Sequence, residues 1–374
     1  LWENEKTLSE ISPNYKKIFV GDSKKISWGS LITLTGNELF NKARESLENL
    51  SKLPNMNDTG KMLFRGSTLK IFSPAILRTV IQKIDTMNFS NTDNDPKGDI
   101  YEYLISKIKV SGLNGQFRTP RNIIDMMIKL IDPKPGETIC DPACGTAGFL
   151  VSSYKHILQQ NTDKKEIKNN ILDGSKLTTE QWKFLEEKTF NGFDSDSTMA
   201  KISLMNLYMH GLQKSNLKYH DPLTSNLYKS YASQKYDIIF ANPPFTGTVA
   251  PENILSDLNY QLNTSSTELL FVKFILDHLN EGGRAAIIVP NGVVFSDDDA
   301  SIKIRKKILE ECNLKMVLQL PYRIFEPYTP TGTNILILEK KGKTKKVFYY
   351  EMENDGFSLN KKRDPIKDND IPDI

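Results

Sequence analysis

The fold is decided by the stretch Glu137-Thr138-Ile139-Cys140-Asp141-Pro142-Ala143-Cys144-Gly145-Thr146-Ala147-Gly148-Phe149-Leu150. A short strand is expected to end at Asp141, and a turn with two glycines follows it. Because glycine lacks a Cβ, the backbone of this turn can approach a ligand just before a helix expected to begin near Thr146. The fingerprint Gly-x-Gly-x-x-Gly is absent, and Asp141 would repel a pyrophosphate. The stretch predicts a site for a cationic or zwitterionic ligand; a glycine-rich turn without a ligand is the alternative.

S-adenosylmethionine has the charges that this turn favours. It carries a sulfonium and an ammonium group, which a carboxylate at the mouth of a parallel sheet complements. Asp194 ends the next expected strand, where a carboxylate can accept both ribose hydroxyls of the cofactor. Asp196 can take that place instead, or it can cap the following helix.

A second motif, Asn242-Pro243-Pro244-Phe245, follows the apolar run 237–241. The two prolines fix φ and remove two backbone donors, so the turn presents carbonyl oxygens and the Asn242 amide. A planar amine can donate one hydrogen to the Asn242 side-chain oxygen and the other to the Pro243 carbonyl, while its ring stacks on Phe245. The motif therefore predicts a site for an exocyclic amine; a Pro-Pro loop with a buried Phe is the alternative.

Strand and helix signals alternate from Arg121 onward, which predicts an α/β fold with a doubly wound, mostly parallel sheet and its ligands at the carboxyl ends of the strands. The expected strands cover 138–141, 189–194, 236–240, 285–289, 316–320 and 334–338, and the expected helices cover 123–131, 146–159, 198–210 and 268–279.

Three regions are expected along the chain. Residues 1–95 show helical periodicity and predict a small helical domain, which ends at the polar loop 91–98. Residues 96–345 form the catalytic domain. Residues 346–374 form a tail that leads into a truncated helical extension.

Composition is that of a soluble globular protein, with 39% hydrophobic and 25% charged residues. There is no apolar run long enough to span a membrane and no signal peptide, which predicts a cytoplasmic protein. The three cysteines form no disulfide framework or zinc motif. A net charge of +3 is too small to indicate a nucleic-acid-binding surface, so any positive surface for DNA must be local, as at Lys340–Lys346 or Lys361–Arg363. For the first of these groups, a solvated turn is an equally good interpretation.

Several further segments, taken together with the two motifs, carry a resemblance to a known protein family. Beside the two motifs, the chain carries Gly115-Gln116-Phe117-Arg118-Thr119-Pro120, Asp221-Pro222-Leu223, Pro290-Asn291-Gly292-Val293-Val294-Phe295, Leu320-Pro321, Phe325-Glu326-Pro327-Tyr328-Thr329, Thr333-Asn334-Ile335-Leu336 and Asp355-Gly356-Phe357-Ser358-Leu359-Asn360-Lys361-Lys362-Arg363. Together these segments resemble the DNA adenine-N6 methyltransferases, and within them the modification subunit of type I restriction-modification systems. The resemblance runs from about Leu63 to Pro365. It implies a seven-stranded S-adenosylmethionine-dependent methyltransferase sheet whose last strand is antiparallel.

The resemblance also implies roles for individual residues. Asp221 would accept a hydrogen bond from the adenine amine of the cofactor, and Thr119 would contact its methionine end; a solvent-facing Asp-Pro turn is the alternative for Asp221. The full set of expected cofactor-binding residues is Thr119, Pro120, Asp141, Ala143, Gly145, Thr146, Gly148, Asp194 and Asp221, and the expected catalytic residues are Asn242, Pro243, Pro244 and Phe245. No metal is expected.

The expected reaction is direct methyl transfer to the N6 amine of an adenine that is flipped out of DNA and stacked on Phe245. No segment after Phe245 is large enough to recognise a target sequence. The resemblance accordingly implies a separate specificity subunit, a restriction subunit and a second copy of this chain as partners, with no membrane contact.

Three other functions remain open at the level of sequence. The Asn-Pro-Pro motif also suits the methylation of a protein glutamine or an RNA guanine amine. A non-catalytic assembly subunit can keep the fold, although the intact motifs disfavour it. A nicotinamide-dependent oxidoreductase is disfavoured because the pyrophosphate fingerprint is absent.

Overall fold

A computed structural model describes residues 16–86, 98, 101, 119–169, 171–224, 233–250, 262–326, 329–360 and 363–374. The chain divides into two compact units, Leu1–Ile105 and Ser106–Ile374. The predicted helix start at Asp99, most of segment 115–120 and the pair Lys361-Lys362 lie outside the described residues. Within the described ranges, no helix combines the length and apolarity needed to cross a bilayer.

The first unit is helical, as predicted from its periodicity. Its two longest described helices are α3 (Gly36–Asn49) and α5 (Pro74–Asp85), which pack through Leu39, Leu77 and Ile81. Ser73 begins α5 by accepting the Ile76 N–H, and Pro74 occupies the first turn, where no donor is needed. The shorter elements are η1 (Gly21–Ile26), α2 (Trp28–Leu31), η2 (Leu50–Lys52) and α4 (Asp58–Phe64).

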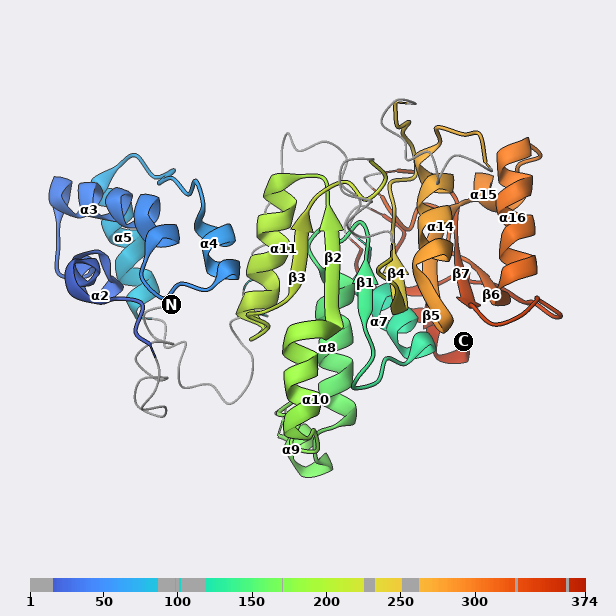
Figure 1. The fold of residues 1–374 in the computed structure, drawn as a ribbon, viewed down its shortest axis with the longest axis horizontal. Coiled ribbons are helices and arrows are strands. Elements are labelled where there is room, and N and C mark those ends of the chain that lie inside the picture. The colour runs from blue at the N-terminus through green and yellow to red at the C-terminus, as the bar shows by residue number, and fades with distance from the viewer. Residues whose placement is uncertain are drawn as a thin grey trace. The chain divides into compact units, whose positions relative to one another are not determined.

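The second unit is built on a sheet with the order β3-β2-β1-β4-β5-β7-β6-β8 (Figure 1). Strands β3, β2, β1, β4 and β5 are mutually parallel, whereas β7 is antiparallel to both β5 and β6. This confirms the predicted methyltransferase sheet with one reversed strand. The strands are β1 (Ile139–Asp141), β2 (Phe190–Asp194), β3 (Asn216–Tyr219), β4 (Tyr236–Ala241), β5 (Leu279–Pro290), β6 (Asn313–Gln319), β7 (Thr333–Glu339) and β8 (Phe348–Glu351).

Helices cover both faces of this sheet. Side chains alternate along β4, so Phe240 stacks on Phe149 of α8 at one face, and Ile239 meets α14 at the other. Figure 1 shows α14, α15 and α16 in front of the sheet, with α7 and α8 behind it. The helices of this unit are α7 (Arg121–Ile131), α8 (Gly148–Gln160), α9 (Lys164–Lys168), α10 (Thr179–Phe184), the π-helical η3 (Leu185–Thr189), α11 (Ser197–Met209), α14 (Thr267–His278), α15 (Asn291–Phe295) and α16 (Asp299–Glu311).

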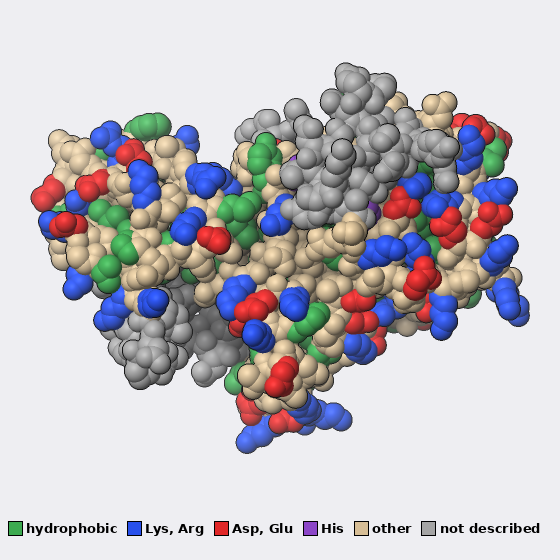
Figure 2. Space-filling model, viewed as in Figure 1, with side chains coloured by type: hydrophobic (Ala, Val, Ile, Leu, Met, Phe, Trp, Pro, Cys, Tyr) green, Lys and Arg blue, Asp and Glu red, His purple; other side chains and the backbone are tan. Residues whose placement is uncertain are grey.

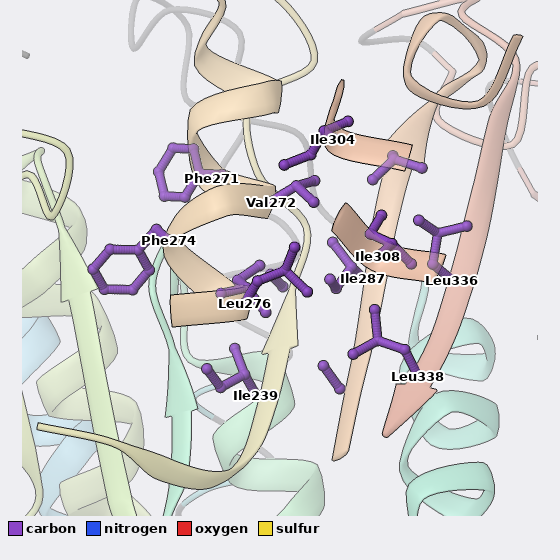
Figure 3. Close-up of a cluster of buried hydrophobic side chains, with 14 of the residues drawn as sticks. Ile239, Phe271, Val272, Phe274, Leu276, Ile287, Ile304, Ile308, Leu336 and Leu338 are labelled. Atoms are coloured by element: carbon purple, nitrogen blue, oxygen red, sulfur yellow. The ribbon is translucent and has the colours of Figure 1, made fainter. Parts of the chain in front are cut away.

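The main core lies between the sheet and helices α14 and α16. Leu276 from α14 and Ile308 from α16 lie beside Ile287 and Leu336 on the strands (Figure 3). Phe274, on another side of α14, contacts the Phe193 ring of β2 edge to face. These side chains are almost completely buried. Truncating one of them to Ala is expected to cost about 2–5 kcal/mol, so this layer fixes the strands whose ends carry the site.

The sheet has one strand more than the seven predicted. Phe348–Glu351 were assigned to a tail, yet they form β8 and pair in parallel with β6. The run Phe348-Tyr349-Tyr350 has the aromatic composition that favours strands. Beyond it, β9 (Asp355–Phe357) and β10 (Pro365–Asn369) form a separate antiparallel hairpin, followed by η5 (Ile371–Asp373).

Charged side chains are mixed on the surface. Figure 2 shows Lys and Arg interleaved with Asp and Glu across the displayed face of the larger unit. The Lys340–Lys346 run follows the end of β7. Because Glu339 pairs with Arg284, near the beginning of β5, and Thr333 pairs with Pro290 at its end, this lysine run lies at the edge opposite the carboxyl end of β5. That position favours the solvated-turn interpretation.

Candidate active site

The two motif turns leave the same edge of the sheet. Strands β1 and β4 are parallel neighbours, with Ile139 opposite Ile238 and Cys140 opposite Ile239. The turn after Asp141 and the turn that begins at Asn242 therefore stand side by side. A ligand held by one turn can reach a ligand held by the other, which the proposed chemistry requires.

Positive φ angles shape the turn after β1. Gly145 has φ +54° and Ala147 has φ 62°, so residues 145–147 remain a loop and α8 begins at Gly148, two residues later than expected. A Cβ at Gly148 would lie 2.9 Å from Ile124 of α7, so only glycine fits there without displacing that side chain. A Cβ at Gly145 would meet nothing within 4 Å, so the space beside it is open.

Helix α11 holds this turn from the side. Ser203 donates a hydrogen bond to the Gly145 carbonyl, and the Asn206 Nδ2 donates one of 2.8 Å to the Thr146 carbonyl. Both side chains are buried. These two residues were not predicted from the sequence, although a Ser and an Asn three positions apart on the apolar face of a helix were a usable signal.

Two carboxylates, those of Asp141 and Asp194, accept hydrogen bonds from the backbone of this turn. The Asp141 side chain accepts the Ala143 N–H at 3.1 Å, and Asp194 accepts the N–H groups of Gly145 at 2.9 Å and Asp196 at 2.8 Å. Burial raises the pKa of Asp141 to about 8, and the nearby Asp194 adds to this effect. Burial also raises the pKa of Asp194, against the lowering effect of its backbone hydrogen bonds. A cation placed here would stabilise both ionised forms.

Asp196 and Asp221, the other two acidic residues considered for the site, accept hydrogen bonds from nearby backbone N–H groups. Asp196 is the N-cap of α11 and accepts the N–H groups of Thr198 and Met199 at 2.7 and 3.0 Å. Asp221 accepts the Leu223 N–H at 2.9 Å in an Asx turn. The backbone N–H of His220 donates 2.8 Å to the Asp194 carbonyl, so Asp221 follows a residue bonded directly to the end of β2. Asp194 and Asp221 therefore stand at the same edge as Asp141.

The Asn242 side chain is anchored on one side only. Its Nδ2 donates a 2.9 Å hydrogen bond to the Thr119 Oγ1, while its buried Oδ1 accepts no hydrogen bond within the described part of the chain. Pro120 follows as the N-cap of α7. The amide oxygen is therefore a buried acceptor without a donor among the described residues, and its role in holding an amine stays a prediction.

The aromatic residue of the motif is covered. Pro243 is buried and Pro244 is exposed, whereas Phe245 is only 3% exposed and meets Phe325 edge to face at 5.2 Å between ring centroids. Stacking of a base on Phe245 thus requires the residues around that ring to shift. Phe325 belongs to the turn after β6, and its contact with this motif was not predicted from the sequence.

Comparison with known proteins places this geometry in one family. A family model described as "N-6 DNA Methylase" matches residues 92–374. Among curated proteins, the chain is 32% identical over 354 residues to the type I restriction enzyme EcoEI methylase subunit of Escherichia coli, covering 93% of this chain and 68% of that protein. It spans 58% and 64% of the lengths of two other type I methylase subunits that it matches.

Solved structures agree with the fold. A modification subunit of a putative type I restriction enzyme from Vibrio vulnificus YJ016 superposes with a TM-score of 0.79 at 26% identity, over 97% of this chain and 78% of that one. A putative class I S-adenosylmethionine-dependent methyltransferase from Listeria monocytogenes superposes with a TM-score of 0.54 at 18% identity, over 96% and 95%. The second likeness concerns the fold alone.

Proposed function

This chain belongs to the N-6 DNA methylase family, and we propose that it methylates the N6 amine of adenine in DNA with S-adenosylmethionine as the donor. One observation carries the proposal. The Asn242 amide is fixed by Thr119, and its buried Oδ1 lacks a partner among the described residues. Asn242 directly follows β4, the strand beside β1, so it lies next to the turn that joins Asp141 to Gly145. A planar amine can donate the hydrogen bond that this oxygen lacks.

The residues around the glycine turn fit S-adenosylmethionine. The open space beside Gly145 and the buried Asp141 carboxylate suit its ammonium and sulfonium charges. Asp194 can accept hydrogen bonds from the ribose hydroxyls of the cofactor, and Asp221 can accept one from its adenine amine. Thr119 and Pro120 are assigned to its methionine end. Ala143, Thr146 and Gly148 give the turn its shape.

The chain's own groups then orient the target. When bound, S-adenosylmethionine supplies the methyl group. Asn242 Oδ1 accepts one hydrogen of the target amine, and the Pro243 carbonyl accepts the other. These two bonds draw the nitrogen toward a tetrahedral geometry, with its lone pair directed at the neighbouring turn. Pro244 keeps the turn rigid, since its ring fixes φ.

The target base enters the site by leaving the DNA stack. A base inside a duplex cannot reach a turn at the edge of a sheet, so the enzyme extrudes it. Phe245 provides the aromatic surface for the flipped adenine once the residues covering its ring have shifted. A movement of the 321–326 turn, which carries Phe325, accompanies binding in this proposal.

Partners follow from the relatives. The EcoEI protein is a methylase subunit of a type I restriction enzyme. We place this chain in a complex of the same kind, in the cytoplasm, with a separate specificity subunit, a restriction subunit and a second copy of itself. The specificity subunit selects the DNA sequence, while this chain supplies the transfer site.

The test is methyl transfer by the full-length protein co-expressed with its specificity subunit. Radiolabelled S-adenosylmethionine is incubated with unmethylated DNA, and the modified bases are mapped by sequencing. Label in N6-methyladenine at a defined site supports the proposal. Label in cytosine, in RNA or in a protein glutamine with DNA unlabelled contradicts it. The RNA and protein alternatives are not favoured by the family match.

A further inference from the structure

The geometry points to Asp355, in the C-terminal hairpin, as a positioning residue that fixes the start of α7 and, through Thr119, the orientation of the Asn242 amide. The inference rests on the proposed function, because it concerns the same site. It assigns a role to a residue that lies beyond the sheet and far from both motif turns in the sequence.

Asp355 makes a buried contact with the first turn of α7. Its side chain is fully buried. The Asn122 Nδ2 donates 2.7 Å to the Asp355 backbone carbonyl and 2.8 Å to its Oδ2. Arg363 pairs with the same Oδ2, and its guanidinium lies 5.5 Å from the centroid of the Phe357 ring. A buried carboxylate with a charged partner and an amide donor is held in one orientation.

The hairpin that presents Asp355 is held by its own contacts. Asp370 Oδ2 accepts the N–H groups of Glu353 at 2.7 Å and Asn354 at 2.9 Å. Asp355 pairs across the hairpin with Asn369. Gly356 adopts φ +85°, and a Cβ there would lie 3.1 Å from the Asn369 side chain. The hairpin thus provides a firm anchor for Asn122.

The contact reaches the active site over a short path. Asn122 is the second residue of α7, and the N–H groups of Ile123 and Ile124 donate to the Pro120 carbonyl at 3.1 and 3.0 Å. Thr119, the next residue toward the N-terminus, accepts the hydrogen bond from Asn242. Holding Asn122 therefore fixes where the Thr119 hydroxyl lies, and so which way the amide oxygen faces.

The other end of α7 offers a matched control. There Arg284 Nε donates 3.0 Å to the Ile131 carbonyl, and its guanidinium forms two hydrogen bonds with Glu137, of 2.8 and 2.9 Å. This partly buried ion pair holds the same helix but lies at the end away from Thr119. Glu137→Gln weakens it at a comparable structural cost.

The experiment is a double-mutant cycle in the full-length protein with its specificity subunit. Asp355→Asn and, separately, Asn122→Ala are each combined with Thr119→Val, and kcat and the KM for S-adenosylmethionine are measured. Asn122→Ala keeps the Asp355–Arg363 pair and so preserves the hairpin. Asp355→Asn and Asn122→Ala alone are each expected to lower kcat by about 10- to 100-fold, with a smaller rise in KM because Thr119 also contacts the cofactor in the proposed function. In the Thr119→Val background, neither substitution lowers kcat further, whereas Glu137→Gln has the same small effect in both backgrounds.

Hydrogen exchange gives a readout that does not depend on activity. Amides of Ile123 and Ile124 are expected to exchange faster in Asn122→Ala than in the parent or in Glu137→Gln. Multiplicative losses in kcat, or unchanged exchange, overturn the inference. If the parent complex leaves adenine unmethylated but exchange responds as expected, the proposed function fails while the link from Asp355 to α7 stands.

Discussion

Asn242 Nδ2 and Thr119 Oγ1 lie 2.9 Å apart, although 123 positions separate the two residues in the chain. The bond crosses from the end of β4 to the start of α7. Because the nitrogen side of the amide is occupied, its oxygen side is the one left to accept a hydrogen bond. The directionality of this single bond decides what kind of group the site can accept.

Asn242→Ala removes that acceptor. Methyl transfer is expected to fall by at least about 10²–10³-fold, the usual loss when one positioned electrostatic contact is removed. Cofactor affinity, measured by calorimetry, stays within a few-fold because the glycine turn is untouched. If the variant instead loses its cooperative thermal transition, the turn is structural and the prediction is wrong.

Thr119→Val removes the hydroxyl but keeps the shape of the side chain. The Asn242 amide can then rotate, so the rate of transfer is expected to fall by about tenfold or more, consistent with the loss of one hydrogen bond worth about 0.5–1.5 kcal/mol and of its alignment. Thr119→Ser keeps the hydroxyl and serves as the control. Equal activity of the Val and Ser variants under single-turnover conditions would contradict this role.

Asp141 gives cofactor binding a pH dependence. Its pKa is raised to about 8 by burial, so at neutral pH the free protein holds this group mostly protonated, and a bound cation favours the ionised form. Binding below pH 8 must therefore release a proton. Affinity is expected to rise by up to about tenfold per pH unit between pH 6 and 7.5, where the cofactor's amino group remains largely charged.

Titration calorimetry in buffers of different ionisation enthalpy measures the proton released. In Asp141→Asn, the Asn oxygen can still accept the Ala143 N–H, but the titrating group is gone. This variant should bind S-adenosylmethionine weakly and with a flat pH profile. A profile as steep as that of the parent protein would assign the proton to another group.

Ser203→Ala removes the hydroxyl that bonds to the Gly145 carbonyl, so the turn loses one support and cofactor affinity is expected to fall by about fivefold or more. Ser153 is a matched control, since it is also fully buried and donates 2.8 Å to the Phe149 carbonyl, within α8. Both variants should lose about 1 kcal/mol of stability in urea denaturation. An equal loss of affinity in both would show that α11 has no special role.

The sequence predicts the two turns at this edge of the sheet well. Strand ends followed by Gly or Pro are short-range signals, so Asp141, Gly145 and Asn242 can be assigned from their immediate neighbours in the chain. The side-by-side placement of the two turns also follows from the alternating pattern, because parallel strands end at one edge.

Contacts between segments far apart in the chain could not be predicted from the sequence. The Asn122–Asp355 pair spans 233 positions. Asp355 begins a segment that carries the family resemblance, but nothing in the sequence connects it with Asn122. Burial of Phe245 depends on Phe325, which belongs to a turn between two other strands. Strand β8 lay in a region assigned to a tail, since an edge strand of four residues is too short for a clear period-two pattern.

The reversal of β7 carries a practical benefit. It sends the chain to the far end of the sheet at residues 340–346, where Lys343 is exposed. All three native cysteines are buried and unpaired, so Lys343→Cys would offer a thiol that a maleimide dye reaches selectively. A fluorophore attached there would report on binding of a ligand or partner without occupying the edge of the sheet that carries the candidate site.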